Sequence, residues 1–155
     1  MSTYFFDSSA LVKRYHQEIG TDAVNRMIDD PDSRLFIARL AVVEVQSAFA
    51  RRVRERAISV ADFDIVCQRF LDDIGQQRFR VVRMTDVHYR TAERLIRQYG
   101  PQPGQLRLRT LDALQLAVAL AVHQHTPLDF FVTADDNQGS AARAEQLTVL
   151  NPAQT

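Results

Sequence analysis

The sequence has little of several features that mark specialised classes of protein. It contains one cysteine, Cys67, in 155 residues, so no disulfide can form within the chain and a disulfide scaffold is excluded. Its longest apolar stretch, Leu111 to Val122, is well short of the roughly 20 residues that span a bilayer. The N-terminus lacks the basic segment and apolar run of a signal peptide. We therefore expect a cytoplasmic protein with no membrane partner.

Net charge and lysine are also lacking. The formal net charge is zero, so the chain as a whole has no electrostatic attraction to nucleic acids or membranes. Lys13 is the only lysine, and all other basic residues are arginine. A GC-rich genome favours arginine codons and explains this bias simply. The other interpretation is phosphate recognition, because a guanidinium group binds phosphate through two parallel hydrogen bonds.

The length and the pattern of the chain predict one α/β domain spanning residues 1–155. The length is near the commonest domain size, and no internal repeat or linker is present. Short runs rich in aromatic and β-branched residues alternate with helical segments, which favours a mostly parallel sheet of four to five strands. The expected strands are residues 3–6, 35–38, 79–82, 129–133 and 147–150.

Several helices are predicted from their capping residues and breaks. We expect Ser8 to cap a helix over residues 9–15, and Ser59 with Asp62 to form a capping box. The segment Gly100-Pro101-Gln102-Pro103-Gly104 predicts a loop. Further helices are expected over residues 21–29, 40–57, 86–99, 108–125 and 139–146.

Four acidic residues stand in apolar surroundings, where an ionised carboxylate is costly. Asp7 follows Tyr4-Phe5-Phe6, Glu44 interrupts an apolar helix, and Asp135 follows a predicted strand. Asp112 lies in the first turn of a helix in which Gln115 is the only other polar residue from Leu111 to Val122. In a parallel sheet, ligands bind beyond the carboxyl ends of the strands, so Asp7 and Asp135 can meet at one edge.

The four acids suggest a shared site for a hard divalent cation. Each acid taken alone has an ordinary explanation, as a turn residue, a helix-start carboxylate or a solvent-facing group. Three or four carboxylates in one pocket, however, cannot ionise together without a counter-charge, which Mg²⁺ or Mn²⁺ supplies. Carboxylates, a metal ion and a means of holding a polyanion suit phosphodiester hydrolysis.

Basic residues lie close in sequence to these acids and can hold the polyanion. Arg51, Arg52, Arg54 and Arg56 continue the helix of Glu44. Lys13 and Arg14 follow Asp7, and Arg107 and Arg109 precede Asp112. Basic side chains beside a metal site can neutralise phosphates without reading the sequence of a nucleic acid. The alternative is a solvated helix face, in which Glu55 is mixed among the arginines.

The chain resembles the PIN-domain family and, within it, the VapC-type toxin ribonucleases of type II toxin–antitoxin systems. Four ordered segments carry the resemblance, which covers essentially the whole chain: Asp7-Ser8-Ser9-Ala10-Leu11-Val12-Lys13, Val43-Glu44-Val45, Leu111-Asp112-Ala113-Leu114-Gln115-Leu116-Ala117 and Val132-Thr133-Ala134-Asp135. The resemblance implies an α/β/α sandwich and an endoribonuclease dependent on Mg²⁺ or Mn²⁺. It also implies a cognate antitoxin that blocks the site, and a homodimer.

Carried onto this sequence, the resemblance gives each candidate residue a role. The acidic site is Asp7, Glu44, Asp112 and Asp135, with Asp7 and Asp112 the most dependable metal ligands. Either Asp135 or Asp136 can face the site, and the family's Thr-x-Asp pattern favours Asp135. Ser8 or Thr133 would orient a ligand or a water molecule. The candidate RNA-binding residues are Lys13, Arg51, Arg52 and Arg109.

Other α/β proteins with acids at strand ends fit less well. A phosphoacceptor receiver domain has paired acids after its first strand and a later lysine, whereas Asp7 is single and no lysine follows Lys13. A haloacid-type phosphatase has Asp-x-Asp where this chain has Asp7-Ser8-Ser9. A non-catalytic PIN-like module that binds RNA or protein remains the alternative to an endoribonuclease.

Overall fold

Five parallel strands form one sheet in the computed structural model, which describes residues 1–101 and 107–155. The order across this sheet is β3-β2-β1-β4-β5. The predicted α/β class and parallel sheet are therefore confirmed. The strands are β1 (Thr3–Phe6), β2 (Arg34–Ala38), β3 (Arg80–Val82), β4 (Phe130–Val132) and β5 (Val149–Leu150).

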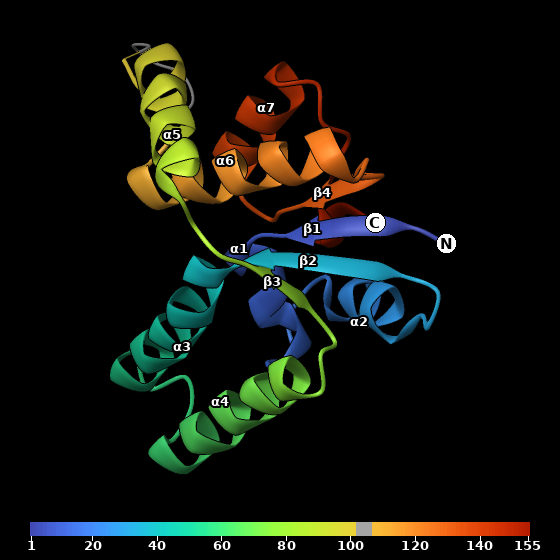
Figure 1. Cartoon of the computed structure of the whole chain (residues 1–155). Coiled ribbons are helices and arrows are strands. Elements are labelled where there is room, and N and C mark those ends of the chain that lie inside the picture. Colours follow the sequence, from blue (N-terminus) through green and yellow to red (C-terminus); the bar gives the residue numbers. More distant parts are fainter. Residues whose placement is uncertain (102–106) are drawn as a thin grey trace.

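Helices cover both faces of the sheet and complete an α/β/α sandwich (Figure 1). One face packs against α1 (Ser8–Leu11), the 3₁₀ turn η1 (Val12–Arg14), α2 (Thr21–Asp29), α3 (Arg39–Arg54) and α4 (Val60–Gly75). The opposite face packs against α5 (Asp86–Tyr99), α6 (Thr110–His125) and α7 (Asp136–Ala144). A 3₁₀ turn, η2 (Pro152–Gln154), follows β5. No helix among the described residues is long and apolar enough to cross a membrane.

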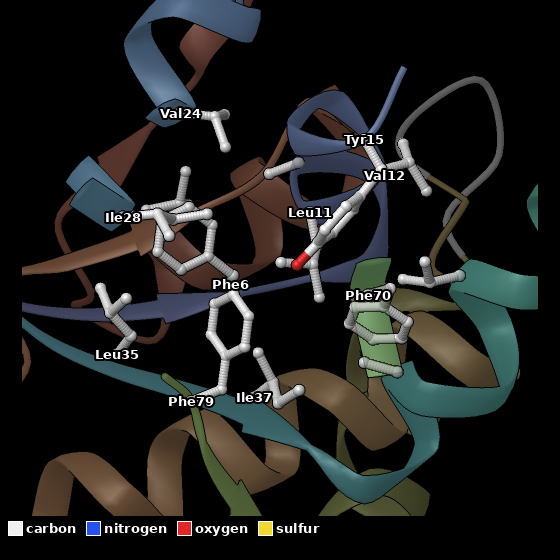
Figure 2. Close-up of a cluster of buried hydrophobic side chains, with 14 of the residues drawn as sticks. Phe6, Leu11, Val12, Tyr15, Val24, Ile28, Leu35, Ile37, Phe70 and Phe79 are labelled. Carbon is white, nitrogen blue, oxygen red and sulfur yellow. The ribbon is translucent and has the colours of Figure 1, made fainter. Parts of the chain in front are cut away.

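The sheet separates two hydrophobic cores, and β1 supplies both. Successive side chains of a strand point to opposite faces, so Phe6 enters the core under α1–α4 while Phe5 enters the core under α5–α7. Figure 2 shows Phe6 among Leu11, Ile37 and other apolar side chains of the first core. Both phenylalanines are fully buried, which fixes the end of β1 and hence the position of Asp7.

Two helices begin earlier than the sequence predicted, because an acid caps each of them. The predicted Ser8 cap is wrong: Asp7 is the cap, and its carboxylate accepts the backbone N–H of Ala10. The helix expected over residues 139–146 begins at Asp136, since Asp135 accepts the N–H of Gln138. Carboxylates are strong caps because they satisfy N–H groups that have no partner in the helix.

The other predicted breaks are close to those observed. The capping box of Ser59 and Asp62 is confirmed. The helix expected over residues 9–15 is instead a short α-helix followed by η1, and the helix expected to reach residue 57 ends at Arg54. The loop expected at Gly100–Gly104 lies partly outside the described residues.

The strand order determines where a ligand can bind. From β1 the chain moves outward to β2 and β3, then returns to the other side of β1 for β4 and β5. The connection after β1 runs to one side of β1, and the later connection into β4 runs to its other side. The carboxyl ends of β1 and β4 therefore lie where the strand order reverses, which is the usual ligand site of an open parallel sheet. Asp7 follows β1 and Asp135 lies just beyond β4.

Candidate active site

The four predicted acids line one cleft of about 570 Å³. Asp7 lies at the end of β1, Glu44 in α3, Asp112 in the first turn of α6, and Asp135 before α7. The structure thus brings together four acids from segments far apart in the sequence. The same cleft is lined by Ser8 and by the candidate RNA-binding residues Lys13, Arg51, Arg52 and Arg109.

Asp7 is the most deeply placed of the four acids. It is 3% exposed, and its carboxylate accepts hydrogen bonds from the Ser9 hydroxyl at 2.8 and 3.0 Å and from the Ala10 N–H at 3.0 Å. Burial raises the pKa of Asp7 to about 7, although these hydrogen bonds oppose the shift. The ionised form is therefore costly unless a cation compensates it.

Glu44 is held by two neutral groups from other elements. Its Oε2 accepts a hydrogen bond from the Ser8 hydroxyl at 2.7 Å and another from the side-chain amide of Gln115. The Gln115 amide also donates to Ser8 Oγ at 2.8 Å, which closes a three-residue network. Burial raises the pKa of Glu44, and the hydrogen bonds from Ser8 and Gln115 act in the opposite direction.

Asp112 and Asp135 share one cationic neighbour, Arg109. The guanidinium group lies 3.2 Å from Asp112 Oδ2 and 3.6 Å from Asp135 Oδ2. Burial raises the pKa of Asp112, and the hydrogen bond from Arg109 opposes this rise. Among the described residues, Arg109 is the one basic side chain that forms an ion pair with any of the four acids.

The adjacent acids Asp135 and Asp136 differ in position. Asp135 lines the cleft, whereas Asp136 is exposed and its carboxylate lies 3.5 Å from the Asn151 amide. Thr133 does not line the cleft. It is 1% exposed, and its hydroxyl accepts the Asp135 N–H at 3.1 Å, so Thr133 fixes the backbone of Asp135 from beneath.

Basic residues line the same cleft: Lys13, Arg51, Arg52 and Arg54, here called the basic wall, with Glu18 beside them. Lys13 is 7% exposed, and its ammonium group donates to the Ile19 carbonyl at 2.9 Å. Arg52 pairs with Glu18 at 3.1 Å, and its second terminal nitrogen, Nη1, is buried without a protein partner among the described residues. The side chain of Arg51 is 66% exposed and lies 4.0 Å from Glu55. The four acids, here called the acidic wall, and the basic wall thus line one cleft without ion pairs between these two groups of described residues.

The oxygen atoms that line the cleft suit a hard divalent cation. In the described residues, however, they are not yet in positions from which they could coordinate one ion together. Four carboxylates and a serine hydroxyl line the cleft, and oxygen is the ligand that Mg²⁺ and Mn²⁺ prefer. Within residues 1–101 and 107–155, no three His, Cys, Asp or Glu side chains are placed to hold an ion directly. Each acid is engaged instead by a hydroxyl, an amide or Arg109. A cation would have to replace some of these contacts.

Three polar residues that the sequence did not single out as site residues hold the acids in place. Ser9 joins the two strand ends, because its hydroxyl donates to Asp7 and accepts the Ala134 N–H at 2.9 Å. Gln138 is fully buried and donates to the Asp112 carbonyl at 3.2 Å. Gln115 had a visible signal, as a polar residue three positions after Asp112 in an apolar helix. Ser9 and Gln138 had none.

Comparison with known proteins identifies the family. The family model of the PIN domain matches residues 4–144. The chain belongs to the PIN domain family. It is also 30% identical over 151 residues to ribonuclease VapC35 of Mycobacterium tuberculosis, which covers 97% of each protein. The resemblance drawn from the four sequence motifs is therefore confirmed.

Solved structures share the PIN fold at low sequence identity. VapC20 of Mycobacterium tuberculosis, described as a Sarcin-Ricin loop cleaving toxin, superposes with a TM-score of 0.62 at 15% identity, over 89% of this chain and 94% of that chain. A chain of VapBC2 from Rickettsia felis, bound to a DNA fragment from its promoter, gives a TM-score of 0.59 at 14% identity, over 96% and 98% of the two chains. At these identities, the likeness supports the fold alone.

Proposed function

We propose that this PIN-domain protein is an endoribonuclease that depends on Mg²⁺ or Mn²⁺ and acts as the toxin of a toxin–antitoxin pair. The observation that carries the proposal is the convergence of Asp7, Glu44, Asp112 and Asp135 in one cleft that basic residues also line. Its similarity along nearly the whole chain to a ribonuclease, VapC35, supports the same activity.

The residues of the cleft divide the work of phosphodiester hydrolysis. As the family resemblance implies, Asp7 and Asp112 would hold a divalent ion, and Glu44 and Asp135, which line the same cleft, would complete the acidic wall. When bound, the ion would compensate the carboxylates and activate water for attack on phosphorus. Ser8 and Gln115 keep the Glu44 carboxylate directed into the cleft. Lys13, Arg51 and Arg52 would bind backbone phosphates on either side of the scissile bond.

We extend the proposal to partners. The expected antitoxin would cover the cleft, since a protein that blocks the acidic wall prevents both metal and RNA from binding. The VapC-type resemblance and the similarity to VapC35 support this partner. The homodimer and the cytoplasmic location expected from the sequence stay predictions, and size-exclusion chromatography with light scattering would test the former.

Removing one carboxylate at a time tests the proposed activity. Asp7→Asn and Asp112→Asn should each lower RNA cleavage by roughly 1,000-fold, equivalent to about 4 kcal/mol in the barrier. Asparagine keeps the shape and the helix-capping ability of aspartate, so both variants should fold. Cleavage of a labelled single-stranded RNA with Mn²⁺, Mg²⁺ or EDTA is the measurement. Wild-type rates in either variant, after repurification to exclude a contaminating nuclease, would refute the mechanism.

One observation favours a second candidate, the non-catalytic PIN-like module. No metal-binding group is already formed among the described residues, because hydrogen bonds and Arg109 engage the acids. Such a module would bind RNA through the basic wall without cleaving it. Calorimetric titration with Mn²⁺ separates the candidates: an enzyme of the proposed type binds the ion, and a protein that binds RNA but no ion is the module.

A further inference from the structure

Arg109 is placed unlike any other basic residue of the cleft. Lys13 and Arg52 pair with Glu18, and Arg51 lies near Glu55, and in the part of the chain that the structure describes none of these three residues forms an ion pair with the four acids. Arg109 instead contacts two members of that wall, Asp112 at 3.2 Å and Asp135 at 3.6 Å. It is also the residue immediately before α6, three positions from Asp112.

The guanidinium group supplies the positive charge that a metal ion would supply. It lies against Oδ2 of both acids, while the remaining oxygen of Asp135, Oδ1, accepts the N–H of Gln138. Asp7 and Glu44 accept hydrogen bonds from neutral donors and form no ion pair with Arg109 among the described residues. A cation that binds Asp112 and Asp135 must therefore compete with this one side chain.

The guanidinium group of Arg109 can move away from Asp112 and Asp135 at a low cost in free energy. Its side chain is 68% exposed, and ion pairs in contact with water are weak. Its backbone is held at the start of α6, where the Arg109 carbonyl accepts the Ala113 N–H at 2.9 Å. A displaced guanidinium group would thus stay at the mouth of the cleft, beside the place where a phosphate must approach the acids.

We propose that Arg109 is a resident counter-ion that the divalent cation displaces, and that it then binds the phosphate of the RNA. This inference rests on the proposed function. One side chain thereby serves two states in turn: it neutralises Asp112 and Asp135 before the metal arrives, and it neutralises substrate afterwards. The consequence is a pair of opposite effects, because removing Arg109 removes a competitor of the metal and a ligand of the RNA.

The variant Arg109→Gln tests both effects. Titration calorimetry with Mn²⁺, in the absence of RNA, should show binding roughly tenfold tighter than in the wild type, because Arg109 no longer competes for Asp112 and Asp135. At saturating Mn²⁺, the KM for a labelled single-stranded RNA should rise roughly fivefold from the loss of one phosphate contact. A purely structural role for Arg109 would weaken both metal binding and RNA binding.

Arg51→Gln is the matched control, because it removes an equal charge from the same cleft without touching the acids. It should raise the KM for RNA and leave Mn²⁺ affinity within roughly twofold, since exposed charges beyond contact distance are screened. Arg109→Gln with unchanged or weaker Mn²⁺ affinity, or with an unchanged KM, would overturn the inference and leave the proposed function standing. A wild-type protein that binds no Mn²⁺ would overturn both.

Discussion

The acidic and basic walls of the cleft are built in different ways. The acids come from four elements and are fixed by hydrogen bonds that cross between them, such as Ser9 to Ala134 and Gln115 to Ser8. The basic wall comes from η1 and α3, and Arg51 and Arg54 extend from an exposed helical surface. The acidic wall therefore depends on the whole fold, whereas much of the basic wall depends on one helix.

This difference predicts how each wall contributes to function. Fixed carboxylates suit a role in the chemical step, because their positions relative to a metal must be maintained within a fraction of an ångström. Exposed arginines suit the binding of a polyanion, since phosphate contacts tolerate small displacements. Changes to the acidic wall should alter kcat and the pH dependence of folding, and changes to the basic wall should alter KM and the response to salt.

The largest effect should come from the titration of buried Asp7 in the metal-free protein. Its folded-state pKa of about 7 lies above its ordinary value of 3.8. The folded state thus keeps a proton that the unfolded state loses, so stability falls as pH rises from about 4 to 7 and levels off above that. The shift corresponds to about 4 kcal/mol. Asp7→Asn lacks this titration, so its stability relative to wild type should rise by up to that amount.

Urea unfolding in EDTA, at several values of pH from 4 to 8, measures this change. The informative quantity is the difference in free energy of unfolding between Asp7→Asn and the wild type, because titrations common to both proteins cancel. A difference that stays constant with pH would show that Asp7 is not protonated in the folded state. Adding Mn²⁺ should reduce the difference at pH 8 by stabilising ionised Asp7 in the wild type.

The contrast between the walls also explains what the sequence could predict. The four acids were found because each interrupts or ends an apolar run, and burial makes such a charge conspicuous. Ser9 and Gln138 could not be found in this way, because their role is to join Asp7 to Ala134 and Asp112 to the start of α7. Those contacts exist only after β1, β4 and α6 have packed together.

Helix starts were predicted incorrectly for a related reason. Ser8 and Asp7 are both good capping residues, and local sequence does not decide between them. In the structure the backbone of Asp7 still pairs with β4, through its N–H and the Val132 carbonyl at 3.1 Å, so the helix begins at the next residue. Asp7, the residue that follows β1, thereby becomes both a cap and a member of the site. Pairing between distant strands decided the boundary.

A smaller effect on activity should distinguish Asp135 from Asp136, the adjacent acids that follow β4. Asp135→Asn should lower kcat/KM by roughly 100-fold, or about 2.7 kcal/mol, because Asp135 lines the cleft. Asp136→Asn should stay within roughly twofold of wild type, since Asp136 is exposed and points toward Asn151. Steady-state cleavage assays on both variants are the measurement. Equal losses would mean that the acidic wall needs only negative charge near α7 rather than a carboxylate in one position.

The smallest effect should come from the exposed part of the basic wall, Arg51 and Arg54. The double variant Arg51→Gln/Arg54→Gln should raise the KM for single-stranded RNA roughly fivefold and leave kcat nearly unchanged. The slope of log KM against log salt should fall by about 1.4, because each phosphate contact on a single strand contributes about 0.7. Arg52→Gln is the comparison variant, because Arg52 forms an ion pair with Glu18 whereas Arg51 and Arg54 are exposed. A salt slope equal to that of the wild type would show that Arg51 and Arg54 do not contact RNA phosphates. Lys13, Arg52 and Arg109 would then be the residues that bind the substrate.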